Sequence, residues 1–232
     1  MKIKQFKYSS DNFGYLIHGD KSALGIDCGA VDNILSYLKS SDLDLTLLTN
    51  THNHPDHTAG NSQLLNKTCA SFLSFEDLMS NSVINLDNGT VNAFHTPGHT
   101  EDSVIFHTGN SLVTGDTLFN GTIGNCFSGN LKAFYKSISF ILTFPPGTVI
   151  YAGHDYVDYS IKFAKIIDAD NRYFDSYLKK YNPAHVLSTL EDELKINPYL
   201  RFNDEKMTEI LKAKGLLVNT GYQRWESIMS LG

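Results

Sequence analysis

The sequence has little of what marks a membrane, nucleic-acid-binding or disulfide-stabilised protein. Its 232 residues contain no apolar run long enough to span a bilayer. Acidic residues outnumber basic ones, 25 to 19, so no basic surface for nucleic acid or anionic lipid is expected. The three cysteines, Cys28, Cys69 and Cys126, are odd in number and widely spaced, which argues against a disulfide framework. Because the first residues also lack the apolar core of a signal peptide, we expect a cytoplasmic protein.

The hydrophobic pattern changes near residue 157. Before that point short apolar runs alternate with turn residues, and the expected strands cover residues 1–7, 15–17, 23–27, 45–48, 103–106, 112–113 and 149–151. Helical spacing covers residues 31–39, 60–65, 131–142, 160–167, 173–181, 206–214 and 223–231, and no strand pattern follows Tyr156. Strands mixed with helices, followed by helices alone, predict an α+β domain over residues 1–157 and a helical domain over residues 158–232.

One stretch carries an unusual density of metal-binding side chains. His52, His54, Asp56 and His57 fall within six consecutive positions, directly after the apolar run 45–48. Imidazole nitrogen and carboxylate oxygen are ligands that suit zinc, iron and manganese. A surface loop gains nothing from crowding such groups together, so metal binding is favoured over chance clustering.

Three further loops contain metal-competent residues, namely His99, Asp116 and His154. Each lies in a loop with Gly or Pro just before it, as expected if several strand ends converge on one site. Together with the cluster they make seven candidate ligands. One tetrahedral zinc takes four at most, so seven ligands predict two metal ions with one carboxylate bridging them.

Four motifs, in their order along the chain, resemble the metallo-β-lactamase superfamily. They are T-H-x-H-x-D-H at residues 51–57, P-G-H-T at 97–100, G-D-T-L-F at 115–119 and G-H-D-Y at 153–156. Within it the chain resembles the glyoxalase II, or hydroxyacylglutathione hydrolase, family, because residues 188–190, Glu193 and 197–201 resemble that family's helical C-terminal domain. The resemblance implies a four-layer αβ/βα sandwich of two facing sheets, with a C-terminal helical domain.

The resemblance also implies the roles of individual residues. The first metal would be held by His52, His54 and His99, the second by Asp56, His57 and His154, with Asp116 bridging the two. The implied cofactors are two divalent ions, zinc first, with iron or manganese as alternatives. Water activated between them would attack the carbonyl of a 2-hydroxyacyl thioester such as S-lactoylglutathione. The expected catalytic residues are then His52, His54, Asp56, His57 and Asp116.

The family's substrate contacts are only partly present. Tyr156 stands where the family uses a tyrosine against the thiol carrier. In the segment that contacts glutathione, Gly-Lys-Phe-Tyr-Glu-Gly in the family, Asn125 and Phe127 replace the lysine and the tyrosine. Of the basic residues near the family's C-terminus only Arg224 is found, with Lys212 and Lys214 in the preceding helix as candidate substitutes. We expect a small-molecule acyl-thiol substrate, with S-lactoylglutathione a poor substrate of raised KM, and the sequence leaves the identity of the thiol carrier open.

Two other functions fit the same motifs. A persulfide dioxygenase has the same fold with a single iron, but its members usually lack the helical part found here after residue 157. The other alternative is a metal-binding protein without hydrolase activity, although a decayed site would have lost some of the seven residues. Metal content separates the enzymes: two ions per chain favour hydrolysis, and one iron with oxygen consumption favours dioxygenation.

The remaining candidates receive structural interpretations. With the ligand set complete, His95 is expected in a turn or behind the ligands, and His18, His107 and His185 are expected to be ordinary histidines. Asp27 is expected either to orient a ligand histidine, which we favour, or to be a turn residue that ends its strand. Cys126 has no neighbour that would activate its thiol, so we expect it to be structural.

Overall fold

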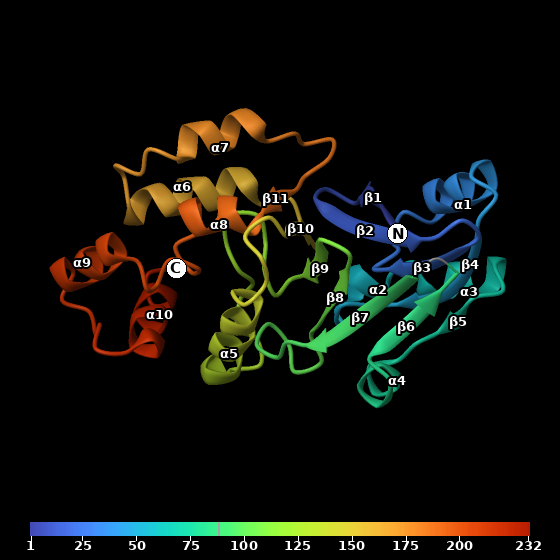
Figure 1. Ribbon diagram of the computed structural model, residues 1–232, viewed down its shortest axis with the longest axis horizontal. Coiled ribbons are helices and arrows are strands. Elements are labelled where there is room, and N and C mark those ends of the chain that lie inside the picture. The colour runs from blue at the N-terminus through green and yellow to red at the C-terminus, as the bar shows by residue number, and fades with distance from the viewer. Residues whose placement is uncertain (88) are drawn as a thin grey trace.

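The structure, a computed structural model that describes residues 1–87 and 89–232, contains two facing β-sheets (Figure 1). Strands β3 and β4 run parallel, as do β9 and β10, whereas β1–β2, β7–β8 and β8–β9 are antiparallel, so both sheets are mixed. The first sheet has the order β1 (Lys2–Tyr8), β2 (Asn12–His18), β3 (Ser22–Ile26), β4 (Asp44–Thr49), β5 (Ser71–Phe72). The second has the order β11 (Ser188–Thr189), β10 (Val149–Ala152), β9 (Ser111–Gly115), β8 (Val104–Thr108), β7 (Gly89–His95), β6 (Val83–Leu86).

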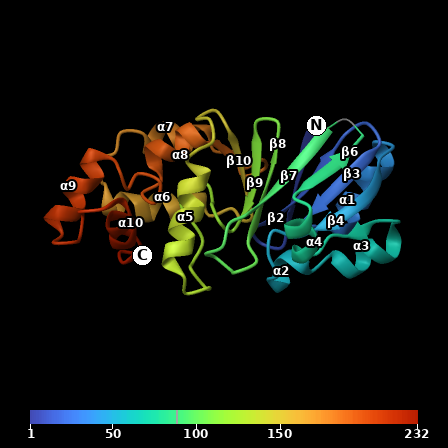
Figure 2. The same ribbon diagram turned by 60° about the horizontal axis from the view of Figure 1, so that its bottom comes forward.

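Helices cover the outer faces of both sheets. On the first sheet lie α1 (Val31–Ser40) and α3 (Asn61–Lys67), and short helices α2 (Pro55–Thr58) and α4 (Phe75–Ser80) lie in the neighbouring connections. Helix α5 (Leu131–Ile141) packs on the second sheet. The C-terminal helices gather at the end of the molecule away from α1 and α3 (Figure 2): α6 (Val157–Ile167), α7 (Phe174–Lys180), α8 (Leu190–Ile196), α9 (Glu205–Ala213) and α10 (Gly221–Met229). Of the helices in the described part of the chain, none is long and apolar enough to cross a membrane.

The layers follow from the alternation of side chains along the strands. In β2, Tyr15 and Ile17 belong to the core between the two sheets, whereas Leu16 belongs to the outer cluster. That outer cluster also contains Ile34 of α1 and Leu64 of α3. Successive strand side chains point to opposite faces, and because both faces of β2 are covered, the whole strand is buried. These layers agree with the expected α+β sandwich.

The C-terminal helices complete the cores of the sheets. Val157 and Ile161 of α6 and Phe174 of α7 belong to the core between the two sheets. Trp225 of α10 is fully buried and meets Phe134 of α5 edge-on, with ring centroids 5.7 Å apart. The division between residues 1–157 and 158–232 therefore stays a prediction. Helix α6 begins at this point in the chain, but its apolar side chains pack with those of the first domain.

Two C-terminal elements differ from the prediction. The expectation of no strand after Tyr156 was wrong, because β11 pairs antiparallel with β10, with Ile150 opposite Ser188. Helix α8 follows β11 directly and was not predicted. A two-residue strand is too short to show alternation. The start of α8 is signalled only by a capping box between Thr189 and Asp192. The other predicted helices and strands agree with the observed ones to within a few residues.

Glu193 connects α8 to the loop that leads to the functional site. Its fully buried carboxylate accepts hydrogen bonds from the Gly121 backbone N–H at 2.8 Å and from the Asn197 side chain at 3.0 Å. The other oxygen faces the hydroxyls of Ser188 at 2.6 Å and Tyr177 at 3.3 Å. Burial raises the pKa of Glu193 to about 7, although these hydrogen bonds oppose the shift. The folded protein therefore favours the neutral acid at this position.

Replacing Glu193 by glutamine should remove a pH-dependent loss of stability. A carboxyl whose pKa is raised on folding stabilises the protein fully below its unfolded pKa, and that contribution is lost as the pH rises through the folded pKa of about 7. Glutamine does not ionise, and its amide can donate to the two hydroxyls. Relative to wild type, the free energy of unfolding of Glu193→Gln should rise by ~2–3 kcal/mol between pH 5 and 8, at ~1.4 kcal/mol for each unit of pKa shift.

Urea unfolding at pH 5, 6, 7 and 8 measures this difference. The control is Glu191→Gln on the same helix, because the Glu191 side chain is 59% exposed and forms an ion pair with Lys195. Equal pH dependence in the two variants would show that Glu193 does not carry the effect.

Candidate metal centre

Loops at one edge of the sandwich bring the seven candidate ligands together. The connection after β4 carries the cluster at residues 52–57, with His54 at the N-terminus of α2 and His57 within it. The connection between β7 and β8 carries His99. Asp116 and His154 follow β9 and β10, and because these two strands run parallel, their C-terminal ends meet at the same edge. Residues distant in the sequence are thus neighbours in the fold.

The first group consists of His52, His54 and His99. Nε2 of His52 lies 2.9 Å from Nδ1 of His54, and Nε2 of His99 lies 3.2 Å from the same Nδ1. One nitrogen from each ring lies within 4.8 Å of the others. Three imidazoles that face one another at these distances form a candidate site for a divalent metal ion.

The second group consists of Asp56, His57 and His154. Nε2 of His57 lies 3.2 Å from Nε2 of His154, and the Asp56 carboxylate lies 3.6 and 3.4 Å from these two nitrogens. Asp116 lies between the groups. Its carboxylate oxygens are 3.5 Å from His99 Nε2 on one side, and 3.4 and 3.5 Å from His57 and His154 on the other.

The outward-facing ring nitrogens decide where the protons are. His57 Nδ1 lies 3.0 Å from Asp27, His154 Nδ1 lies 3.0 Å from Asp11, and His99 Nδ1 lies 2.9 Å from the Asn125 carbonyl. All three partners are acceptors, so these nitrogens carry the protons. The Nε2 lone pairs of the same rings then point inward, toward one another.

Such inward-facing lone pairs fit a metal better than hydrogen bonds. Two unprotonated nitrogens 3.2 Å apart, as in His57 and His154, repel each other unless a cation lies between or beside them. Asp116 adds a second indication, because its buried Oδ1 has no hydrogen-bond partner among residues 1–87 and 89–232. The donor set of imidazole and carboxylate therefore fits divalent metal binding.

If protons were the only source of positive charge in the two groups, burial and the neighbouring carboxylates would act in opposite directions on the pKa values of the histidines. Burial lowers the pKa of His52 to about 4, which keeps that ring neutral. Burial also acts to lower the pKa of His57, but the charges of Asp27 and Asp116 outweigh it and raise the value to about 11. Burial acts to raise the pKa of Asp116, but the neighbouring His154 and His57 rings hold it well below its usual range. The buried carboxylates thus require positive charge, and divalent ions supply it without protonating the rings.

Asp27 is connected by hydrogen bonds to histidines of both groups. Besides His57, it accepts hydrogen bonds from the backbone N–H of Thr51 at 2.8 Å and from the Thr51 hydroxyl at 2.7 Å. The same hydroxyl lies 3.0 Å from His52 Nδ1, so Asp27 acts on both groups. Its backbone adopts φ of 52°, a left-handed conformation that aspartate tolerates better than most residues. The structure places Asp27 as expected of a carboxylate that orients a histidine.

Two residues of the site were missed by sequence reasoning. Asp11 holds His154 as described, and the Asn12 amide donates to the Asp56 carboxylate at 2.9 Å. Both lie where β1 ends and β2 begins, at the opposite end of the first domain's sequence from His154. The only local signal is an Asp-Asn pair in a hairpin, which is ordinary turn chemistry.

Two of the three residues expected to contact the substrate, Asn125 and Tyr156, line the larger of two cavities beside the centre, whereas Phe127 is not among its lining residues. This cavity of about 520 Å³ is lined by Asn125 and Tyr156, together with Phe119 and residues of α6. Tyr156 stacks on His154 with ring centroids 5.0 Å apart and the ring planes nearly parallel, so the cavity adjoins the second group. Phe127 is 66% exposed and lies against His99, with ring centroids 5.2 Å apart.

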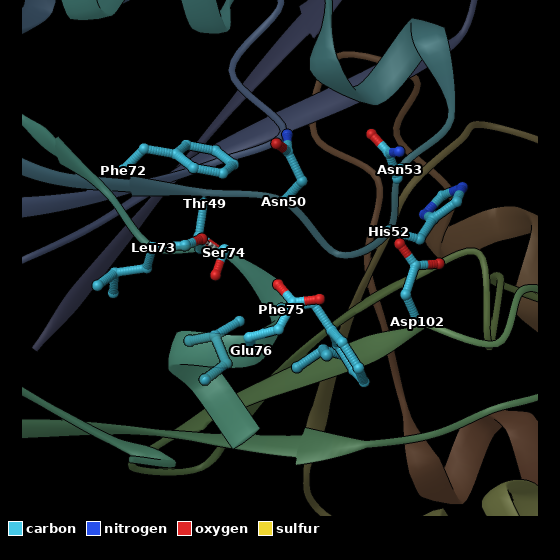
Figure 3. A pocket seen from close by; sticks show the side chains of 12 residues that line it. Thr49, Asn50, His52, Asn53, Phe72, Leu73, Ser74, Phe75, Glu76 and Asp102 are labelled. Atoms are coloured by element: carbon cyan, nitrogen blue, oxygen red, sulfur yellow. Dashed lines mark hydrogen bonds between the residues drawn. The ribbon is translucent and has the colours of Figure 1, made fainter. Parts of the chain in front are cut away.

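A smaller cavity of about 270 Å³ lies on the other side of His52 (Figure 3). His52 and Asn53 lie at one end of it and Phe72 and Leu73 at the other, and Phe75, the first residue of α4, lies between them. The His52 ring points away from Phe72 and Leu73, so its metal-competent nitrogen does not face into this cavity.

The other histidines lie outside both groups. His95 is exposed, and its Nε2 lies 2.7 Å from the Glu101 carbonyl. His18 is buried against Tyr37, His107 packs on Phe144, and His185 is exposed. Cys126 lies beside Ser128, and like the other two cysteines it is a free thiol.

Comparisons with known proteins agree with this geometry. Residues 155–227 match the family model described as hydroxyacylglutathione hydrolase C-terminus. A relative named hydroxyacylglutathione hydrolase, from Pelagibacter ubique, is 32% identical over 229 residues, which covers 89% of this chain and 95% of the relative.

Solved structures show the same fold. The ETHE1 protein of Myxococcus xanthus superposes with a TM-score of 0.70 at 23% identity, covering 99% of this chain and 90% of that protein. A metallo-β-lactamase from Staphylococcus aureus superposes with a TM-score of 0.66 at 21% identity, covering 99% of this chain and 72% of that one. At such identities the likeness shows the fold alone, and it confirms the expected metallo-β-lactamase sandwich.

Proposed function

Because the chain belongs to the hydroxyacylglutathione hydrolase family, we propose that it is a metal-dependent thioesterase that cleaves a 2-hydroxyacyl thioester into an acid and a free thiol. The observation that carries this proposal is the carboxylate of Asp116, which lies 3.4–3.5 Å from ring nitrogens of both groups. A carboxylate shared in this way suits a site for two divalent ions.

We assign the first ion to His52, His54 and His99, the second to Asp56, His57 and His154, and a bridging role to Asp116. Zinc is our first choice, because the donors are mostly imidazole. Bound divalent ions would supply polarisation of the thioester carbonyl and a water that ionises near neutral pH. The acyl carbon gains the water oxygen as its bond to sulfur breaks, and the thiol leaves with a proton.

The protein's own residues prepare the site for this reaction. Asp27 and Asp11 hold protons on the outer nitrogens of His57 and His154, so that the inner lone pairs are available without rearrangement. Phe119 is buried beside His154, with ring centroids 5.8 Å apart, and limits water on that side. Tyr156 forms the wall toward which the sulfur would leave. We propose that residues 158–232 act as the substrate-binding part, since α6 contributes Tyr159 and Phe163 to the same cavity.

The alternative function, a persulfide dioxygenase with a single iron, needs only one of the two ligand groups. The presence of both groups around Asp116, and the hydrolase name of the relative described above, favour hydrolysis. The cytoplasmic location stays a prediction.

The proposal is tested by metal analysis together with substrate assay. Protein purified without chelators is expected to contain two transition-metal ions per chain and to release free thiol from lactoyl thioesters. Removal of the ions with dipicolinate should lower the rate at least about a thousandfold, since metal assistance is worth several kcal/mol, and added zinc should restore it. Full activity in metal-free protein would refute the proposal. One iron per chain, with oxygen consumed on a persulfide substrate, would establish the dioxygenase instead.

A further inference from the structure

The cavity beside Tyr156 is walled by aromatic and neutral residues. The aromatic lining residues are Phe119, Tyr156, Tyr159, Phe163 and Tyr199, and the polar side-chain groups of the lining are the phenol hydroxyls, the Asn125 amide and the Thr122 hydroxyl. Among the described residues that line it, none is a lysine, arginine, aspartate or glutamate. Tyr159 is 68% exposed, so an aromatic face is presented to solvent at the opening. Large exposed aromatic groups beside a cavity are typical of sites for apolar ligands.

The three candidate basic residues, Arg224, Lys212 and Lys214, do not line this cavity. Arg224 donates to the backbone carbonyls of Phe202 at 2.7 Å and Val218 at 2.8 Å. These hydrogen bonds connect α10 to the segments before and after α9. Lys212 and Lys214 are exposed at the end of α9 and do not line the cavity. The candidate substitutes Lys212 and Lys214 therefore place no cation on the wall of this cavity.

This lining is poorly suited to a carboxylate. Glutathione carries two carboxylates, and a hydrogen bond from a cation to such a group strengthens binding about ten- to a hundredfold. A carboxylate that enters a cavity without a cation loses water and gains only neutral donors. The aromatic walls offer apolar area and ring stacking instead.

We propose that this cavity binds the carrier end of an acyl-thiol that bears no carboxylate there, namely an uncharged thiol with an aromatic or aliphatic body. The inference rests on the proposed thioesterase function, and it concerns only which carrier the same site accepts. The reaction is unchanged: water adds to the acyl carbon, the carbon–sulfur bond breaks, and the neutral thiol departs with a proton.

The test compares one acyl group on three carriers. The lactoyl thioesters of glutathione, of glutathione diethyl ester and of phenylmethanethiol differ in carrier charge and shape but present the same scissile bond. With metal-loaded protein, we expect KM for the diester and the aromatic thioester to be at least about tenfold lower than for free glutathione, with kcat within about threefold. A lower KM for free glutathione than for its diester would overturn the inference. Failure to hydrolyse any of the three would overturn the proposed function instead.

Two variants sharpen the test. Asn125→Lys adds a cation to the wall while keeping the backbone carbonyl that accepts from His99, and should lower KM for free glutathione about tenfold and leave the diester unchanged. Lys162→Ala removes an exposed cation one residue before Phe163 on α6, and should change neither KM. If Lys162→Ala instead raises KM for free glutathione alone, Lys162 serves as the carrier's cation and the inference is wrong.

Discussion

Replacing Asp116 by alanine is expected to lower turnover at least about a thousandfold and to reduce the metal content of both groups. Asp116 is the only described residue whose carboxylate lies within 4 Å of ring nitrogens in both groups, so no other carboxylate replaces it as a bridge. Its removal also takes away a buried negative charge that favours two adjacent cations. Loss of several kcal/mol of stabilisation of the developing charge corresponds to a factor of that size.

Elemental analysis and steady-state kinetics on the purified variant measure both effects. His95→Ala is the matched control, because His95 is exposed and contacts the Glu101 carbonyl outside both groups. The control should keep two ions and wild-type turnover. An Asp116→Ala protein that retains two ions per chain would show that the bridge is not needed for assembly of the centre.

The second large effect is expected from Asp27→Asn, an almost isosteric change. The new amide oxygen can still accept from the Thr51 backbone, but the amide nitrogen then faces His57 Nδ1. Two donors do not face each other, so the His57 proton moves to Nε2, which points at His154 Nε2 3.2 Å away. A protonated Nε2 has no lone pair for a metal. We expect ion affinity at the second group to fall about ten- to a hundredfold, and the free energy of unfolding to fall by ~1–3 kcal/mol.

Zinc titration of metal-free protein measures the affinity, and two-dimensional ¹⁵N NMR of the imidazoles reports the His57 tautomer. The tautomer separates a positioning role from simple loss of stability, because a merely destabilised protein would keep the proton on Nδ1. Asp32→Asn, at an exposed position on α1, is the control and should leave both measurements unchanged. Wild-type affinity with an unchanged tautomer in Asp27→Asn would contradict the role assigned to Asp27.

Local patterns predicted most of the fold and all seven candidate ligands. Elements such as β2, β4 and α5 are long enough for their hydrophobic periodicity to be recognised in the sequence. The cluster at residues 52–57 is visible because its donors are adjacent in the chain. The elements missed, among them β5, β11, α4 and α8, have two to seven residues, which is too few for a period to emerge.

The sequence by itself therefore determined which donors the protein possesses and which of its longer segments form strands and helices, because both depend on residues close together in the chain. Only the tertiary structure decided how those donors are used. Asp11 meets His154 across 143 positions, and Asp27 meets His57 across 30, and these contacts select the ring nitrogens that face inward. The tertiary structure likewise decided that Arg224 donates to backbone carbonyls, and that the described residues lining the cavity beside Tyr156 include no lysine, arginine, aspartate or glutamate. Hydrogen-bond geometry between distant segments has no signature in composition or spacing, since it exists only after the sheets have packed.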